Sequence, residues 1–194
     1  SKVLTESNTT HKSVPMLMSD ITACNFDSIY HQKGIITAFK EAGYQTAFFS
    51  NQRYNHSFID FFGKEADTFD FIKEDSLDSA YNPSDDELLA LVAKELSKGN
   101  QKQFIVLHTY GSHFNYRERY PSEDAFFLPD YPVEAEVKYR DNLVNAYDNT
   151  IRYTDSFLSR LIHMLEEQHV DAAMLYTSDH GEDIFDDSRH LFLH

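Results

Sequence analysis

The stretch that decides the fold runs from Ala172 to Thr177 (AAMLYT) and is followed at once by Ser178 to Glu182 (SDHGE). An apolar run of this length with an aromatic and a β-branched residue at its end predicts a buried strand over Asp171–Ser178. That strand would deliver Asp179 and His180 at its carboxyl end, where open α/β sheets carry their active sites. A carboxylate beside an imidazole, with a glycine behind them that lets the backbone turn, suits a divalent metal ion.

Helices and strands alternate along the rest of the chain. Expected helices cover Gly34–Glu41, the residues from an N-cap at Ser84 to Gly99, and Val137–Gln168, and expected strands cover Gln45–Ser50, Phe104–Leu107 and Asp171–Ser178. Strands that alternate with helices pair in parallel, with helices on both faces of the sheet. The pattern therefore predicts an α/β fold, a three-layer sandwich with a largely parallel central sheet.

Composition limits the possible functions. The 194 residues fit one domain, and no apolar stretch approaches the ~18 residues that a membrane helix needs. The net charge of −15 argues against nucleic acid as a partner. Cys24 is the single cysteine, which excludes an internal disulfide framework and a cysteine-rich zinc site. Asn115–Glu136 is a long, proline- and aromatic-rich irregular segment, and loops of that length usually serve a site.

Two histidines flank a turn after the strand expected at Phe104–Leu107. His108 and His113 lie five residues apart around Gly111, so the turn could aim either side chain inward. For His108 we favour a hydrogen-bonded structural histidine. For His113, beyond the turn, we favour contact with a ligand or substrate.

A hydroxyl-rich segment, Thr9–Ser19, leads into an apolar run near the start of the chain. Such a segment is ordinarily a helix N-cap, because the side-chain oxygen accepts from the first free N–H groups. A hydroxyl becomes a nucleophile only when it is activated, and a metal ion can activate it. Thr10 is therefore a candidate nucleophile if the fold places it beside Asp179 and His180.

Five motifs occur in one order along the chain: Thr10-x-x-Ser13-Val14-Pro15, His108-x-x-Gly111-Ser112-His113, Asn145-Ala146-Tyr147-Asp148-Asn149, Ser178-Asp179-His180-Gly181-Glu182 and Leu193-His194. This series resembles the catalytic domain of the phosphoethanolamine transferases, of the alkaline phosphatase and sulfatase superfamily. The resemblance implies transfer of phosphoethanolamine from phosphatidylethanolamine to an envelope glycan such as lipid A or core oligosaccharide. It implies a Thr-linked phosphoryl intermediate, one or two Zn²⁺ ions (with Mn²⁺ or Mg²⁺ as alternatives), and the periplasmic face of the bacterial inner membrane.

The resemblance also implies roles for individual residues. Thr10 matches the nucleophile and is itself a metal ligand, and Asp179 and His180 match ligands of the main zinc ion. His113 and His194 match histidines that hold the transferred phosphoryl group or a second zinc, which makes His113 a catalytic candidate as well as a metal ligand.

Three further positions match the substrate side of the family's site. His108 matches a histidine of the same motif as His113. Asn51 and Gln52, at the end of the strand expected at Gln45–Ser50, fall where the family has polar residues near the donor head group. A plain turn at the strand end remains an equal alternative for these two residues.

Residues 1–194 lack parts of the family's pattern. The membrane-embedded N-terminal region, an upstream Glu ligand of the main zinc and the C-terminal end of the fold have no match. We therefore expect a partial sulfatase-like catalytic domain, incomplete at both ends, monomeric, and attached to the membrane through the missing N-terminal region. This stretch alone is expected to bind zinc weakly and to be inactive.

Other functions stay open. A phosphoglycerol transferase of the lipoteichoic-acid-synthase type also uses a threonine and a metal, and another phosphoester or sulfate ester hydrolase of the superfamily would share the fold. A formylglycine sulfatase is disfavoured, because the residues after Cys24 lack the Pro and Arg that such enzymes need. A non-catalytic relative would use the same Asp and His residues only as hydrogen-bonding groups.

Overall fold

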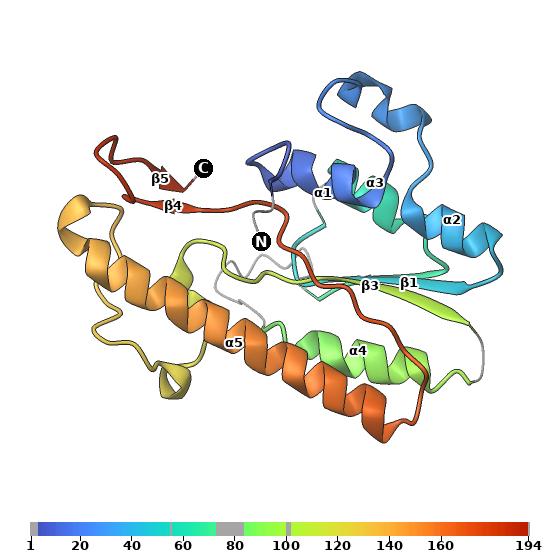
Figure 1. Ribbon diagram of the computed structural model, residues 1–194. Helices are drawn as coiled ribbons and strands as arrows, with labels where there is room; N and C mark the ends of the chain where they lie inside the picture. The colour runs from blue at the N-terminus through green and yellow to red at the C-terminus, as the bar shows by residue number, and fades with distance from the viewer. Residues whose placement is uncertain (1–3, 55, 73–83, 100–101, 194) are drawn as a thin grey trace.

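A parallel sheet of three strands forms the centre of the protein (Figure 1). The computed structural model describes residues 4–54, 56–72, 84–99 and 102–193. The strands are β1 (Gln45–Ser50), β2 (Thr68–Phe71) and β3 (Gln103–His108), in the order β2-β1-β3, and β1 is parallel to both neighbours. Parallel strands need crossover connections, and here α3 and α4 provide them.

Helices cover both faces of this sheet (Figure 1). On one face lie α1 (Thr10–Met18), α2 (Ile35–Glu41) and α3 (Phe58–Gly63), and on the other lie α4 (Glu87–Leu96) and α5 (Arg140–Glu167). The predicted three-layer α/β sandwich is confirmed. The smaller elements are the 3₁₀-helices η1 (Phe26–His31), η2 (Tyr116–Glu118), η3 (Ser122–Asp124) and η4 (Val137–Tyr139), and the antiparallel pair β4 (Asp183–Ile184) and β5 (Phe192–Leu193).

The central strand β1 joins the two helical layers. Successive side chains of a strand point to opposite faces, so Phe48 enters one core and Phe49 the other. Phe48 packs in a cluster that includes Phe62 of α3. Phe49 packs against Leu88 of α4 and Phe157 of α5. A strand buried on both faces needs apolar residues at consecutive positions, which explains its unbroken apolar run.

The segment Asn115–Glu136 is ordered against α5. Tyr116 is fully buried in a third apolar cluster with Leu143 and Ala146 of α5 and Ile184 of β4. The predicted helix over Val137–Gln168 is observed as η4 followed by α5. Because α5 contacts both the segment and β4, it links the long loop to the residues after Asp179.

Two sequence predictions about local structure are wrong. Asp171–Ser178 forms no strand, and Met174, Leu175 and Tyr176 are 43%, 92% and 53% exposed. An apolar run becomes a strand only where a partner strand accepts its backbone hydrogen bonds, and no described strand pairs with this one. Helix α4 begins at Glu87 rather than beside Ser84, because the Ser84 hydroxyl accepts from the Asp86 N–H in a turn that precedes the helix.

Within the part of the chain that the structure describes, no helix is both long enough and apolar enough to cross a membrane.

Candidate active site

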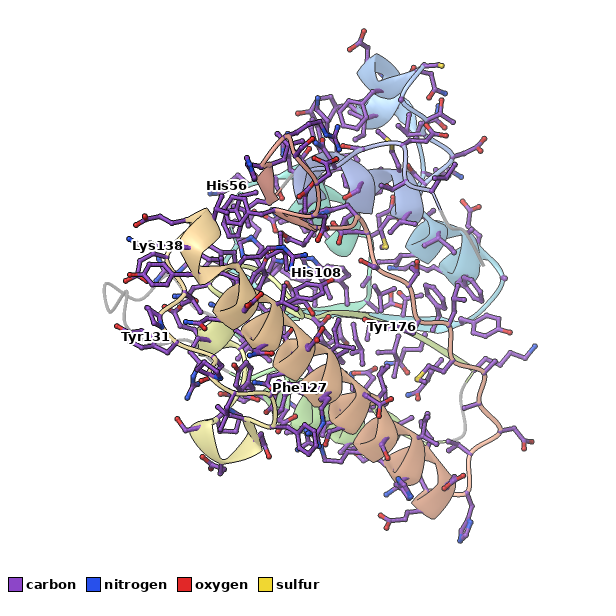
Figure 2. The ribbon with its side chains drawn as sticks, turned by 60° about the vertical axis from the view of Figure 1, so that its left-hand side comes forward. His56, His108, Phe127, Tyr131, Lys138 and Tyr176 are labelled. Atoms are coloured by element: carbon purple, nitrogen blue, oxygen red, sulfur yellow. The ribbon has the colours of Figure 1, made fainter. Side chains whose placement is uncertain are left out.

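Strands β1 and β3 end side by side at one edge of the sheet. Ser50 and His108 are paired in register, and the Ser50 hydroxyl lies 3.0 Å from Nδ1 of His108. The chain leaves β1 toward β2 and later returns to β3 on the other side of β1, which makes this edge a topological switch point. In Figure 2, His108 lies near the middle of the view, whereas Tyr131 and Lys138 lie toward its left-hand edge.

Three residues from opposite ends of the chain meet near this edge. Thr10 is the first residue of α1, and its Oγ1 lies 3.1 Å from Nε2 of His180. Nε2 of His180 lies 3.5 Å from Oδ2 of Asp179. The structure therefore brings together the hydroxyl, carboxylate and imidazole of the two motifs, which are separated by about 170 residues in the sequence.

Neighbouring side chains fix the orientation of this group. Ser13 is buried one turn after Thr10, and its hydroxyl donates to Oδ2 of Asp179 at 2.8 Å. The Thr5 hydroxyl donates to the backbone carbonyl of Asp179 at 2.8 Å. Nδ1 of His180 is 2.9 Å from the carbonyl oxygen of Gly181. A carbonyl only accepts, so Nδ1 carries a proton, and in the neutral ring the lone pair of Nε2 then points toward Thr10.

The donor set fits a zinc ion in its distances. In a tetrahedral site with bonds of about 2.0–2.2 Å, two donor atoms lie roughly 3.3–3.5 Å apart. The separations of 3.1 Å between Thr10 and His180 and 3.5 Å between His180 and Asp179 are close to that spacing. The bond from the opposite ring nitrogen to a backbone carbonyl is typical of metal-binding histidines. Among the described residues, no three His, Cys, Asp or Glu side chains form a metal-binding group, so the Thr10 hydroxyl would be the third donor.

His108 provides a neutral imidazole beside this group. Burial lowers the pKa of His108 from its usual value, and the negative charges of Asp179 and Asp85 oppose that shift only in part. His108 is hydrogen-bonded to Ser50, and both its structural role and its role beside the substrate stay predictions.

The other predicted site residues that the structure describes are His113, Gln52 and Asn51. His113 is exposed, its Nδ1 is 2.5 Å from the carbonyl oxygen of Phe114, and no contact joins it to the described Thr10 group. Gln52 lines a shallow polar hollow beside His108. Asn51 is fully buried and its side-chain amide donates to Asp85, so it holds the Asp85 carboxylate in place. His194 lies outside the described residues, and the roles assigned to these residues stay predictions.

Sequence reasoning missed two groups that hold the site. Ser13 was part of a motif but had no role, although its spacing of three residues from Thr10 places both on one helix face. Tyr116 is fully buried and donates to Oε2 of Glu182 at 3.0 Å, which ties the long loop to the Asp-His motif. Burial and the nearby Glu182 carboxylate both raise the pKa of Tyr116, so it remains a donor.

The chain is similar to known proteins of one family. The family model described as Sulfatase matches residues 1–192. The Kdo(2)-lipid A phosphoethanolamine 7''-transferase of Escherichia coli K12 is 36% identical over 102 residues, which are 51% of this chain and 18% of that protein. The chain therefore spans only a small part of this relative's length.

Two solved structures share the fold. The C-terminal periplasmic domain of phosphoethanolamine transferase EptC from Campylobacter jejuni has a TM-score of 0.82 and 28% identity, and the match covers 97% of this chain and 58% of that one. The corresponding Escherichia coli EptC domain, solved in complex with Zn, has a TM-score of 0.83 at 23% identity and covers 96% of this chain and 53% of that one. The resemblance to phosphoethanolamine transferase catalytic domains is confirmed.

Proposed function

The chain belongs to the Sulfatase family, and on that basis we propose that it transfers phosphoethanolamine from phosphatidylethanolamine to an envelope glycan such as lipid A. One observation carries the proposal: Oγ1 of Thr10 lies 3.1 Å from Nε2 of His180, with Asp179 beside them. A threonine hydroxyl held against an imidazole and a carboxylate has the surroundings of an activated nucleophile.

The reaction would proceed in two displacements at phosphorus. In the first, the Thr10 oxygen forms a bond to phosphorus, the bond to the diacylglycerol oxygen breaks, and diacylglycerol leaves with a proton. In the second, the oxygen of an acceptor hydroxyl forms a bond to phosphorus, the bond between phosphorus and the Thr10 oxygen breaks, and the proton lost by the acceptor ends on Thr10. Thr10, Asp179 and His180 would hold zinc, which when bound lowers the pKa of a coordinated hydroxyl.

The protein's own groups favour the charge that develops on the phosphoryl oxygens. Thr10 stands at the N-terminus of α1, where the backbone N–H groups and the helix dipole favour an anion. Thr9, the N-cap residue, makes no side-chain capping bond there. Ser13 keeps the Asp179 carboxylate in one orientation. We assign to His113 and His194 the task of holding the phosphoryl oxygens.

The names of the relatives support the proposed substrate and the proposed location. The Escherichia coli relative is named for transfer of phosphoethanolamine to Kdo(2)-lipid A, and the Campylobacter jejuni domain is periplasmic. We extend both to this protein: a lipid donor, a glycan acceptor, and the periplasmic side of the inner membrane. We also propose that residues 1–194 are part of a larger catalytic domain and have no turnover alone.

The test is the mass of the full-length protein after exposure to zinc and one phospholipid at a time. Phosphatidylethanolamine should add phosphoethanolamine to the peptide that contains Thr10, and Thr10→Ala should abolish the adduct. Thr9→Ala is the matched control, because the neighbouring Thr9 hydroxyl lies near Ser7 instead of His180, and it should keep the adduct. An adduct only from phosphatidylglycerol would favour phosphoglycerol transfer. No adduct from any phospholipid in zinc-loaded protein would refute the proposal.

A further inference from the structure

Asp85 connects three elements at the carboxyl edge of the sheet. It precedes α4, and its Oδ1 accepts hydrogen bonds from Nδ2 of Asn51 and from the backbone N–H of Tyr110, both at 2.7 Å. Its Oδ2 accepts from the backbone N–H of Gly111 at 2.9 Å. Hydrogen bonds to an ionised acceptor are roughly twice as strong as neutral ones, so Asp85 is a firm anchor for the turn after β3.

The anchored turn carries His113. Gly111 has φ +57°, a left-handed conformation that favours glycine and lets the chain reverse after Tyr110. The Tyr110 ring packs edge-on against the His113 ring at 5.2 Å between centroids. The guanidinium of Arg119 lies 4.0 Å from the centroid of the Tyr110 ring. Fixing the backbone at Tyr110 and Gly111 therefore also fixes the surface on which His113 rests.

We infer that Asp85 is a positioning residue: it holds the Tyr110–Gly111 turn and, through the Tyr110 ring, the place of the His113 side chain. This inference rests on the proposed function, because it gives His113 its task there. Misplacing a catalytic group by about 1 Å can cost about 100-fold in rate, so a residue without substrate contact can still control turnover.

The adjacent carboxylate, Asp86, bonds to a different part of the structure. Asp86 pairs with both terminal nitrogens of Arg160 on α5, at 2.7 and 2.6 Å, and accepts from the Tyr153 hydroxyl at 2.9 Å. Two neighbouring acids thus have separate tasks: Asp85 orders the turn of the site, and Asp86 fastens the start of α4 to α5. Asp86 is a matched control of the same residue type.

The experiment compares Asp85→Asn with Asp86→Asn in the full-length protein. The amide of Asn replaces one carboxylate oxygen by a donor, so at least one of the N–H groups of Tyr110 and Gly111 loses its acceptor. Asp85→Asn should lower kcat about 10- to 100-fold. Asp86→Asn should leave kcat within about twofold of wild type while it lowers thermal stability.

The same substitution in a His113→Ala background separates positioning from a general structural defect. If Asp85 acts through His113, Asp85→Asn should lower kcat less than about threefold once His113 is gone, since coupled residues are non-additive. An equal loss in both backgrounds, or wild-type kcat in Asp85→Asn alone, would overturn the inference.

A second measurement does not depend on activity. Amide hydrogen exchange at Tyr110 and Gly111 should accelerate in Asp85→Asn and stay unchanged in Asp86→Asn. If wild type forms no Thr10 adduct and shows no transfer, the proposed function fails, and the exchange result still decides whether Asp85 orders this turn. Unchanged exchange in Asp85→Asn would reject that role by itself.

Discussion

Asn149 should be the residue on which the order of the long loop depends. It is buried on α5, and its Oδ1 accepts from the backbone N–H groups of Phe126 and Phe127, both at 2.9 Å. Its Nδ2 donates to the Tyr120 hydroxyl at 3.2 Å and to the Phe127 carbonyl at 3.0 Å. Asn149→Ala removes all four bonds, and a buried polar group left unsatisfied costs about 1–3 kcal/mol. Water can reach part of the loop, because Phe126 is 66% exposed, so we expect a loss of about 2–4 kcal/mol in loop stability.

Hydrogen exchange of the purified protein measures this loss directly. A loss of 2–4 kcal/mol corresponds to roughly 30- to 1000-fold faster exchange at the Phe126 and Phe127 amides. Asn145→Ala is the matched control, because Asn145 lies one turn earlier on α5 and makes a single exposed bond to the Pro129 carbonyl. It should change exchange at the two amides less than about fivefold. Exchange in Asn149→Ala within fivefold of wild type would show that this side chain does not hold the loop.

Two further predictions concern groups beside the site. Burial lowers the pKa of His108, so the folded state binds a proton there less readily than the unfolded state does. The contribution of neutral His108 to the free energy of unfolding is therefore fully present above the unfolded pKa of about 6.5 and is lost as the pH falls below it. Denaturation measured from pH 7.5 to pH 5 should therefore show a smaller decline in the free energy of unfolding for His108→Gln than for wild type. Equal declines in the two proteins would contradict this. Ser13→Ala removes the hydrogen bond to Asp179 and should weaken zinc binding about 10-fold, measured by competition with a chromophoric chelator. Unchanged zinc affinity would show that this bond does not orient the ligand.

The sequence predicted the layers of the fold better than the short elements that complete them. Gln45–Ser50 was predicted with the bounds of β1, because an apolar run ended by a polar residue is a local signal. Strand β2 (Thr68–Phe71) and helix α3 (Phe58–Gly63) were not predicted, since both are short and their identity depends on packing against β1 and α1. The sequence of helix α3 nevertheless contains a local signal: Ser57 and Asp60 have the spacing of a capping box, and the structure shows their reciprocal bonds.

Residues of the candidate site were found from the sequence where they belong to a motif and missed where they depend on contacts between elements. Thr10 and His180 were assigned from their motifs, and the structure brings their side chains into contact. Asp85 was interpreted only as an acid near a helix N-terminus, because a sequence pattern reports the helix to which a residue belongs. Its bonds to Tyr110 and Gly111 depend on the crossover that places the start of α4 beside the end of β3.

The Asp-His motif reached the site although the strand predicted to carry it did not form. A strand would hold Asp179 through backbone pairing, but the preceding residues make no ladder. The motif is held instead by side chains from the first residues of the chain: Thr5 bonds the Asp179 carbonyl, Ser13 bonds its carboxylate, and Thr10 meets His180. These contacts fix the Asp179 carboxylate and the His180 imidazole directly, whereas a strand fixes only the backbone behind them. The geometry of the site therefore depends on the start of α1 more than on the exposed apolar run, and substitutions at Ser13 should disturb the site more than substitutions at Leu175.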